Sequence, residues 1–256
     1  MTDFSFAYSH DWKNADGVTK LKRLREEVNM TNQRDHFLLS LRPIIHCWSG
    51  PVPNLRDIFQ AEEINWLLAE SVNNFIDLKL PVRIGIPLID FVIRTGYKDE
   101  PEVDEDGRLL LHRITAVHYA ATQDKHEFID KLFQSTVRQD PNCRSQESSA
   151  NSIYSPLQLA LAGGHEYVAE LLLLNGADPN LTNADESTPL HIICMRRNDD
   201  GLANTFFRIT DEIDQQVPVN VRDKSGWTPL LLAVANLLPN VVDVLFDRGW
   251  CIGYEP

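Results

Sequence analysis

Apolar positions recur in the C-terminal half of the chain as four short, similar segments. Each segment begins with Ser or Thr, continues with proline or alanine in most units, and then places apolar and small residues close together. The segments are TAVHYAA from Thr115, SPLQLAL from Ser155, TPLHIIC from Thr188 and TPLLLAV from Thr228. Their first residues are 40, 33 and 40 positions apart. Self-similarity at a period of about 20 to 50 residues predicts a repeat architecture.

The second unit shows why each position holds its residue. Ser155 can cap a helix N-terminus, and Pro156 lacks an N–H that would have no partner in the first helical turn. Gly163-Gly164 turns the chain, and apolar positions from Val168 onwards recur at the spacing of a second helix. Gly176 ends that helix as a left-handed cap. One such pair cannot bury its own apolar faces, so neighbouring pairs must stack.

A second landmark fixes the register of the units. Asn180 stands eight residues before Thr188, and Asn220 stands eight residues before Thr228. The seven extra residues of the third unit therefore precede Asn220, around its second helix and exit. We expect the segment FRITDEIDQQVP to lengthen that helix and add an acidic lobe. In the first unit two extra residues precede Asn142 and five follow it, in a serine-rich tip loop.

The second unit, SPLQLALAGGHEYVAELLLLNGADPN, closely resembles the ankyrin repeat. The resemblance implies an all-α fold, an ankyrin-repeat solenoid of helix–turn–helix–loop units with a helical N-terminal region. It extends over four repeats, at approximately 115–147, 155–187, 188–227 and 228–256. The chain departs from the family pattern at three places, which alter the tip geometry rather than the fold: Ala116 for proline, Glu186 for the tip glycine, and Trp250-Cys251 for Ala-Asp.

Two segments precede the four repeats, which occupy residues 108–256. Residues 1–50 are polar and charged, and we expect them to be partly disordered, with one helix around Leu21–Val28. Residues 51–107 predict a helical N-terminal cap that includes a degenerate half-repeat. In this cap, Asn54 is expected to start one helix running through LRDIFQAEEINWLLAESV, and PLIDFVI, followed by Arg94-Thr95-Gly96, forms another.

The last predicted helix, which contains VVDVLF, carries several apolar residues. The ends of a repeat stack need polar outer faces. Three explanations stay open: Cys251–Pro256 folds over the end, the apolar face is itself a contact, or the chain is truncated.

The composition limits the classes of partner that we expect this chain to bind. The formal net charge of −13 disfavours nucleic acid and anionic membranes, because both need a basic surface. The N-terminus has no apolar segment after a positive start, and the four cysteines form no CxxC pair. We therefore expect reduced thiols in a cytoplasmic protein, with the nucleus also open. The longest apolar stretch, Phe37–Trp48, is broken by Arg42-Pro43 and is too short to span a bilayer.

Three histidines close in sequence, His112, His118 and His126, raise the question of a metal site. His118, however, occupies the fourth position of its TxxH segment, where other units hold Gln158 and Leu231. A position that accepts imidazole, amide or leucine serves packing and local hydrogen bonding. No Cys/His pair recurs at zinc-binding intervals either, so no metal ligand is predicted.

Catalytic candidates are equally weak. Cys194 has His191 three residues upstream, but a buried small hydrophobic role explains the cysteine better. The acidic run Asp99–Asp106 lacks the pattern of a calcium loop, and no phosphate-binding or nucleophile motif occurs. The sequence predicts no catalytic residue, no cofactor and no small-molecule substrate.

In ankyrin-repeat proteins, partners usually lie along the concave face and contact the repeat tips and the ends of the first helices. The resemblance therefore implies a protein-binding surface made of Thr122, Gln123, Asp185, Ser187, Met195, Arg196, Lys224, Ser225, Trp227 and Asn236. Trp227, Met195 and Arg196 are the strongest candidates, since their residue types are enriched in interface cores. Folding of Trp227 back onto its neighbouring repeat stays open.

These features predict a non-enzymatic scaffold or adaptor that binds an intracellular protein. One alternative is regulatory: an inhibitor of the NF-κB-inhibitor type that sequesters a transcription factor, or a substrate adaptor of a ubiquitin ligase. No F-box or SOCS-box is recognisable in residues 1–80. The other alternative is an enzyme with its catalytic part in that same segment, which is short and poor in paired carboxylates.

Overall fold

The structure, a computed structural model, describes residues 16–28, 34–73, 85–99, 114–134, 139–146 and 153–249. It divides into two compact units, residues 1–99 with 134–138 and residues 100–133 with 139–256. Most of the acidic run, His112, the Trp250-Cys251 pair and the C-terminal segment discussed above lie outside the described residues. No helix in the described part of the chain is long and apolar enough to cross a membrane. The predicted domain limits stay a prediction.

The described elements of the first unit are all helical. They are α2 Gly17–Glu27, α3 Arg34–His46, the 3-10 helix η2 Leu55–Asp57, α4 Ala61–Asn73 and α5 Gly85–Arg94. Helix α5 coincides with the expected half-repeat helix, and Gly96 ends it with a φ of 71°. The left-handed conformation at Gly96 is the predicted glycine cap.

The N-terminal 50 residues contain more helix than the sequence predicts. Helix α2 begins four residues before the predicted start because the Asp16 side chain accepts a 2.8 Å hydrogen bond from the Thr19 N–H. Helix α3 is not predicted at all, although Phe37, Leu41 and Ile44 are buried along it at helical spacing. Its proline, at position 43, obscures that periodicity in the sequence.

The helix predicted to run on from Asn54 is broken in two. The Asn54 side chain accepts from the Arg56 N–H and caps only the short η2 turn. A second cap lies inside the run, where the Glu63 carboxylate accepts a 3.0 Å hydrogen bond from the Gln60 N–H and α4 begins. The single-helix prediction is therefore wrong, because two competing caps occur within one apolar stripe.

The described residues of the second compact unit form four helix pairs and one short hairpin. The helices are α6 Ala116–Thr122, α7 His126–Gln134, α8 Pro156–Gly163, α9 Glu166–Leu174, α10 Pro189–Met195, α11 Leu202–Glu212, α12 Pro229–Ala235 and α13 Pro239–Asp247. Strands β1 Ser145–Gln146 and β2 Ile153–Tyr154 pair antiparallel, with Ser145 opposite Tyr154. The predicted all-α class is confirmed, and the hairpin is a local addition in the serine-rich tip.

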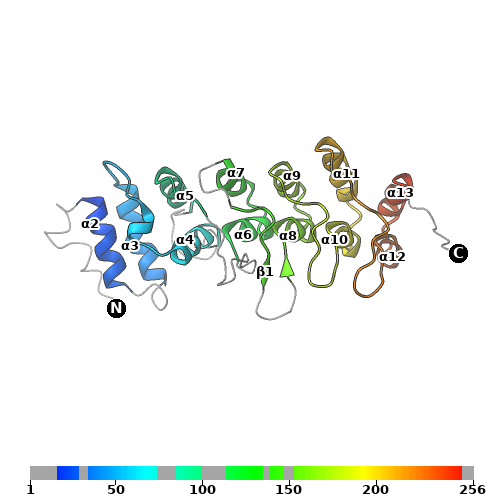
Figure 1. Ribbon diagram of the computed structural model, residues 1–256, viewed down its shortest axis with the longest axis horizontal. Coiled ribbons are helices and arrows are strands. Elements are labelled where there is room, and N and C mark those ends of the chain that lie inside the picture. The colour runs from blue at the N-terminus through cyan, green and yellow to red at the C-terminus, as the bar shows by residue number, and fades with distance from the viewer. Residues whose placement is uncertain are drawn as a thin grey trace, which may run out of the picture. The chain divides into compact units, whose positions relative to one another are not determined.

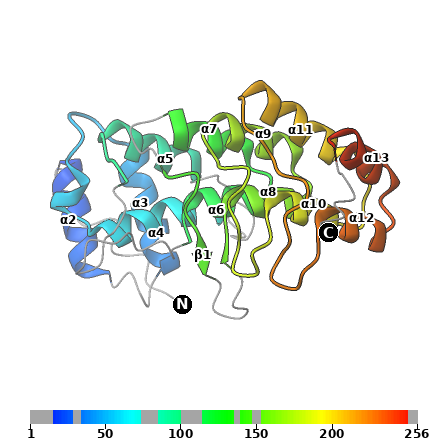
Figure 2. The ribbon, with the colours of Figure 1, turned by 45° about the vertical axis from the view of Figure 1, so that its right-hand side comes forward.

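Two parallel rows of helices make up this unit (Figures 1 and 2). The first helix of each pair lies in an inner row, α6–α8–α10–α12, and the second in an outer row, α7–α9–α11–α13, with neighbours packed in order. The loops that join successive pairs extend on one side of the inner row (Figure 1). The core lies between the rows, where Leu157, Val168 and Leu172 are buried in the second pair. Stacking thus buries the faces that one pair leaves open.

The third pair holds the seven-residue insertion, which is divided between several places. Helix α11 has 11 residues against 9 in α9, so the predicted lengthening is confirmed. Further inserted residues lie before the helix, since the turn 196–201 replaces the two-residue turn 164–165. The exit 213–219 is also longer than the exit 175–179. Both changes place new side chains beside α11.

Candidate protein-binding surface

Each inner helix begins with a side-chain cap. In α8, Gln158 N–H donates to Ser155 Oγ and the Ser155 N–H donates to Gln158 Oε1 at 3.0 Å, which is a reciprocal capping box. In α10, the Thr188 N–H donates to His191 Nδ1 at 3.2 Å. These bonds satisfy backbone N–H groups that a helix start leaves without a partner. Such a cap contributes about 1 kcal/mol to stability.

The same polar side chains also join one pair to the next. Gln158 Nε2 donates to the carbonyl oxygens of Leu181 and Ser187, at 3.1 and 2.9 Å. His191 Nε2 lies 3.1 Å from the carbonyl oxygen of Trp227. Since Nδ1 accepts from a backbone N–H, the proton is assigned to Nε2, which donates to Trp227. The boxes of α8 and α10 therefore fix the tip loops that precede α10 and α12.

Burial keeps this imidazole neutral. Desolvation is the main cause that lowers the pKa of His191 below its ordinary value of 6.5, against smaller opposing contributions from the hydrogen bond to Trp227 and the charge of Asp223. A neutral ring can accept at one nitrogen and donate at the other, as the bridge requires. His191 therefore has the structural role that the TxxH pattern predicts.

The tip loops are held by one acceptor each. Asn183 Oδ1 accepts from the N–H groups of Asp185 and Ser187, both at 2.9 Å. Asp223 Oδ1 accepts in the same way from Ser225 and Trp227, both at 2.9 Å. The Lys224 N–H donates to the Asp185 carbonyl oxygen at 2.9 Å, so the two tips are joined.

We call the tip residues Asp185, Lys224, Ser225 and Trp227 the tip rim. All four are exposed, and Trp227 retains 40% of its accessible surface. Ser187, which the sequence also assigns to the surface, is only 1% exposed, and its backbone N–H and carbonyl oxygen are both hydrogen-bonded. The structure therefore removes Ser187 from the candidate contacts.

The helix-end candidates lie at the C-terminal ends of the inner helices, and some of them stabilise the fold. Arg196 donates to Asp200 at 2.9 and 2.7 Å, and its guanidinium lies against Gly164 of the preceding pair. Asn236 Nδ2 donates to the Cys194 carbonyl oxygen at 3.0 Å. Met195, by contrast, is 40% exposed.

Thr122 and Gln123 form the corresponding helix end in the first pair. The Thr122 hydroxyl donates to the His118 carbonyl oxygen at 2.9 Å, and the Thr122 carbonyl oxygen lies 3.1 Å from His165 Nε2. We name the helix ends Thr122, Gln123, Met195, Arg196 and Asn236 the helix-end rim. The tip rim lies at the N-terminal ends of the inner helices and the helix-end rim at their C-terminal ends.

The family model for ankyrin repeats (3 copies) matches residues 157–254. This segment contains three of the four helix pairs, with their caps and tip loops, so the model and the geometry agree. The chain contains ankyrin repeats.

The chain is similar in sequence to several proteins of different kinds. The chain is 28% identical over 171 residues to alpha-latrotoxin-Lt1a of Latrodectus tredecimguttatus, covering 64% of this chain and 11% of the toxin. It is 25% identical over 183 residues to a putative ankyrin repeat protein of Rickettsia felis, covering 70% of this chain and 71% of that protein. It is 27% identical over 123 residues to the palmitoyltransferase AKR1 of Lachancea kluyveri, covering 48% of this chain and 16% of that enzyme. The chain spans about a tenth of the length of the latrotoxins that it matches.

Leu237 belongs to the helix-end rim by position, although the sequence analysis does not select it. It is 84% exposed, and its φ is +57°. The residue that follows α8 in the same way is Gly164, with a φ of 75°. Aligning the ankyrin repeats with one another would have found a leucine where another unit places glycine. That exchange is the one available signal in the sequence.

The thiols and acidic groups of the described ankyrin repeats do not form a reactive centre. Burial raises the pKa of Cys194 to about 12, so this group is a thiol and not a thiolate nucleophile near neutral pH. Cys143 Sγ lies 3.7 Å from His118 Nδ1, a proximity that the sequence does not predict, but that nitrogen accepts from the Thr115 N–H. Within the described residues, no three His, Cys, Asp or Glu side chains are grouped to hold a metal ion.

Proposed function

We propose that this chain is a scaffold or adaptor that binds a protein partner along the inner row of its ankyrin repeats. Ankyrin repeats are protein-interaction units, and the chain provides them. The observation that carries the more specific proposal is the exposure of Met195, Trp227 and Leu237 in the last two pairs. These apolar side chains lie on the two rims that the inner row connects.

Leu237 is the proposed anchor of the helix-end rim. A side chain at positive φ costs about 1–2 kcal/mol, and 84% exposure means that packing within the chain does not offset this cost. Local strain of this kind is concentrated at binding sites. Full burial of a leucine in an interface contributes about 1.5–3 kcal/mol. A partner that covers Leu237 therefore gives this residue the contact that the fold does not.

Trp227 is the proposed anchor of the tip rim. The His191 bridge and the Asp223 acceptor fix its backbone, so little conformational entropy remains to be lost when the ring is covered. Tryptophan is enriched among residues that dominate binding energy. Lys224 and Ser225 precede it on the same tip and supply polar contacts around the ring.

The polar residues of the helix-end rim belong to the proposed surface, but they are less suitable for testing it. Arg196 and Asn236 already make bonds within the fold, so replacing either would disturb the repeats as well as the surface. Thr122 and Gln123 extend the rim into the first pair. Met195 and Leu237 are cleaner positions for a test because neither donates nor accepts a side-chain hydrogen bond.

Proximity labelling in cells tests the proposal. The full chain should label a set of proteins, and Met195→Ala with Leu237→Ala should remove at least one of them while the chain stays folded. The matched control is Leu174→Ala, because Leu174 is an exposed leucine (55%) on the outer helix α9. If the double variant and Leu174→Ala lose the same labelled proteins, or if neither loses any, a surface centred on the helix-end rim is contradicted.

The identity of the lost labels separates the regulatory alternatives. Loss of a Rel-type transcription factor would assign the inhibitor role. Loss of cullin components would assign the ubiquitin-ligase adaptor role. Loss of any other protein supports the general scaffold.

A further inference from the structure

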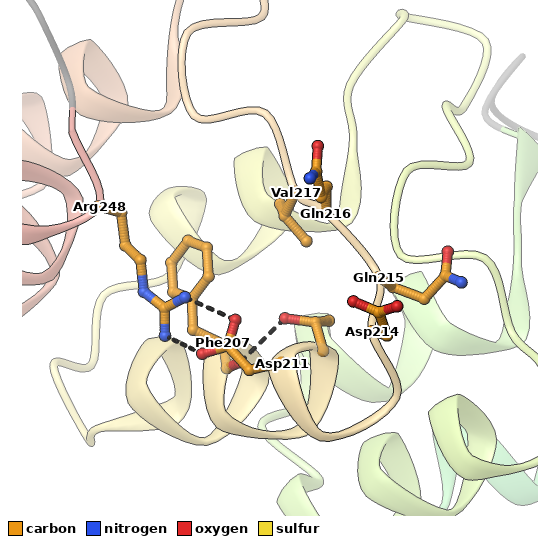
Figure 3. Close-up of a pocket in the computed structure, with 8 residues that line it drawn as sticks. Phe207, Asp211, Asp214, Gln215, Gln216, Val217 and Arg248 are labelled. Atoms are coloured by element: carbon orange, nitrogen blue, oxygen red, sulfur yellow. Dashed lines mark hydrogen bonds and ion pairs between the residues drawn. The ribbon is translucent and has the colours of Figure 1, made fainter.

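A groove on the outer side of the third pair is not part of the proposed inner surface. It has a volume of about 350 Å³, and its walls include Phe207, Asp211, Asp214, Val217 and Arg248 (Figure 3). Residues 207–217 belong to α11 and its exit, the part of the third pair that the insertion enlarges. The groove is therefore specific to this chain rather than to the repeat pattern.

One wall of the groove already holds a guanidinium. Arg248 donates two hydrogen bonds to Asp211, at 2.7 and 2.6 Å, and its Cζ lies 4.6 Å from the centre of the Phe207 ring. Carboxylate pairing and an aromatic face are the two interactions that bind an arginine well. The hydrogen bonds from Arg248 lower the pKa of Asp211, which keeps its carboxylate charged. The wall shows that this environment accommodates a cationic side chain.

The opposite wall carries a second carboxylate, that of Asp214 (Figure 3). Asp214 is exposed, and no hydrogen bond or ion pair of its carboxylate is recorded among the described residues. Its backbone is fixed, because the Asp214 N–H donates to the Asp211 carbonyl oxygen at 3.1 Å and the Gln215 N–H donates to that of Thr210 at 2.8 Å. The backbone that carries the carboxylate is thus held in place before any ligand arrives.

The charges that line the groove do not cancel. Two carboxylates, Asp211 and Asp214, face one guanidinium, Arg248, which leaves one formal negative charge. A single monovalent cation matches this charge. A calcium ion would need about six to eight oxygen ligands, more than these carboxylates supply. Val217, which is partly exposed, adds apolar surface that suits the aliphatic stem of a side chain rather than a bare ion.

We propose that this groove binds one basic side chain, arginine or lysine, of a protein partner. The cation pairs with Asp214, and its stem lies along the apolar wall. The groove would bind a basic residue on a partner segment that passes over the outer helices. It is independent of the inner row, so either site can fail a test without affecting the other.

A titration of the ¹⁵N-labelled full chain with N-acetyl-arginine methylamide tests the groove. The amide signals of residues 211–217 should shift and saturate with a millimolar dissociation constant. The lysine analogue should give the same pattern. The neutral citrulline analogue should not, and NaCl added at matched ionic strength controls for the added salt.

Asp214→Asn is the decisive variant. Asparagine tolerates the φ of +55° as well as aspartate does, so the loop should keep its conformation while the charge is removed. The arginine probe should bind about tenfold more weakly to this variant. Asp243→Asn, at an exposed aspartate of α13 outside the groove, should leave binding unchanged.

Three results would overturn the proposal. They are an absence of saturable shifts with both cationic probes, equal binding of the citrulline probe, and equal weakening by the two aspartate variants. Each would show that the groove does not recognise positive charge through Asp214.

Discussion

At the scale of single residues, strained backbone marks the places where the chain differs from its own repeats. Within the described residues, positive φ values outside glycine occur at Asp124, Glu186, Asp214 and Leu237. Glu186 stands where the next tip has Gly226 and adopts the same left-handed turn, so the departure noted in the sequence does not change the tip. Leu237 differs because a large apolar side chain is both strained and exposed.

Replacing Leu237 by glycine should stabilise the isolated chain. Glycine removes about 1–2 kcal/mol of left-handed strain and gives back up to about 1 kcal/mol through greater freedom of the unfolded chain. The free energy of unfolding in urea should therefore rise by about 0.5–1 kcal/mol. Leu174→Gly, at the end of a regular helix, should give no gain. A Leu237→Gly variant less stable than the wild type would show that the leucine packs within the fold.

At the scale of elements, the helix starts are predictable and the links between pairs are not. The four inner helices begin directly after Thr115, Ser155, Thr188 and Thr228, because a capping hydroxyl acts locally. The second bond of Gln158 or His191, to the next tip, depends on how the pairs stack. Local signals cannot supply that contact.

The His191 bridge should make stability depend on pH. The pKa of His191 in the folded chain lies below its ordinary value of 6.5, so the unfolded chain binds more protons as pH falls. This contribution is complete above about pH 6.5 and is lost as pH falls through that value towards the folded pKa. His191→Gln should keep a bridge of the kind that Gln158 makes and remove this part of the pH dependence.

Urea unfolding at about pH 7.5 and about pH 5.5 measures the effect. The free energy of unfolding should fall less for His191→Gln than for the wild type. Equal falls in the two proteins would contradict the assignment of a buried, neutral imidazole.

At the scale of the whole molecule, the repeats could be found from the sequence while part of the surface could not. Periodicity and capping residues predict the stacked pairs, since both can be recognised from the spacing of residues in the sequence. The sequence places Ser187 on the surface, whereas in the folded repeats it is buried and Gln158 of the preceding pair donates to its carbonyl oxygen. The Asp214 groove was missed because it forms only when the inserted exit folds beside Arg248. The acidic residues of the inserted segment are evident in the sequence, but the groove that they line is evident only in the folded structure.

The most direct test of the account is the affinity of Leu237→Gly for the protein that depends on the helix-end rim in the labelling experiment. Calorimetric titration should show binding weakened by about 10- to 100-fold, which corresponds to the burial of one leucine. Weaker binding should accompany higher stability in the same protein sample, so that misfolding cannot explain it. Unchanged affinity for that partner would contradict the proposal that Leu237 anchors the interface.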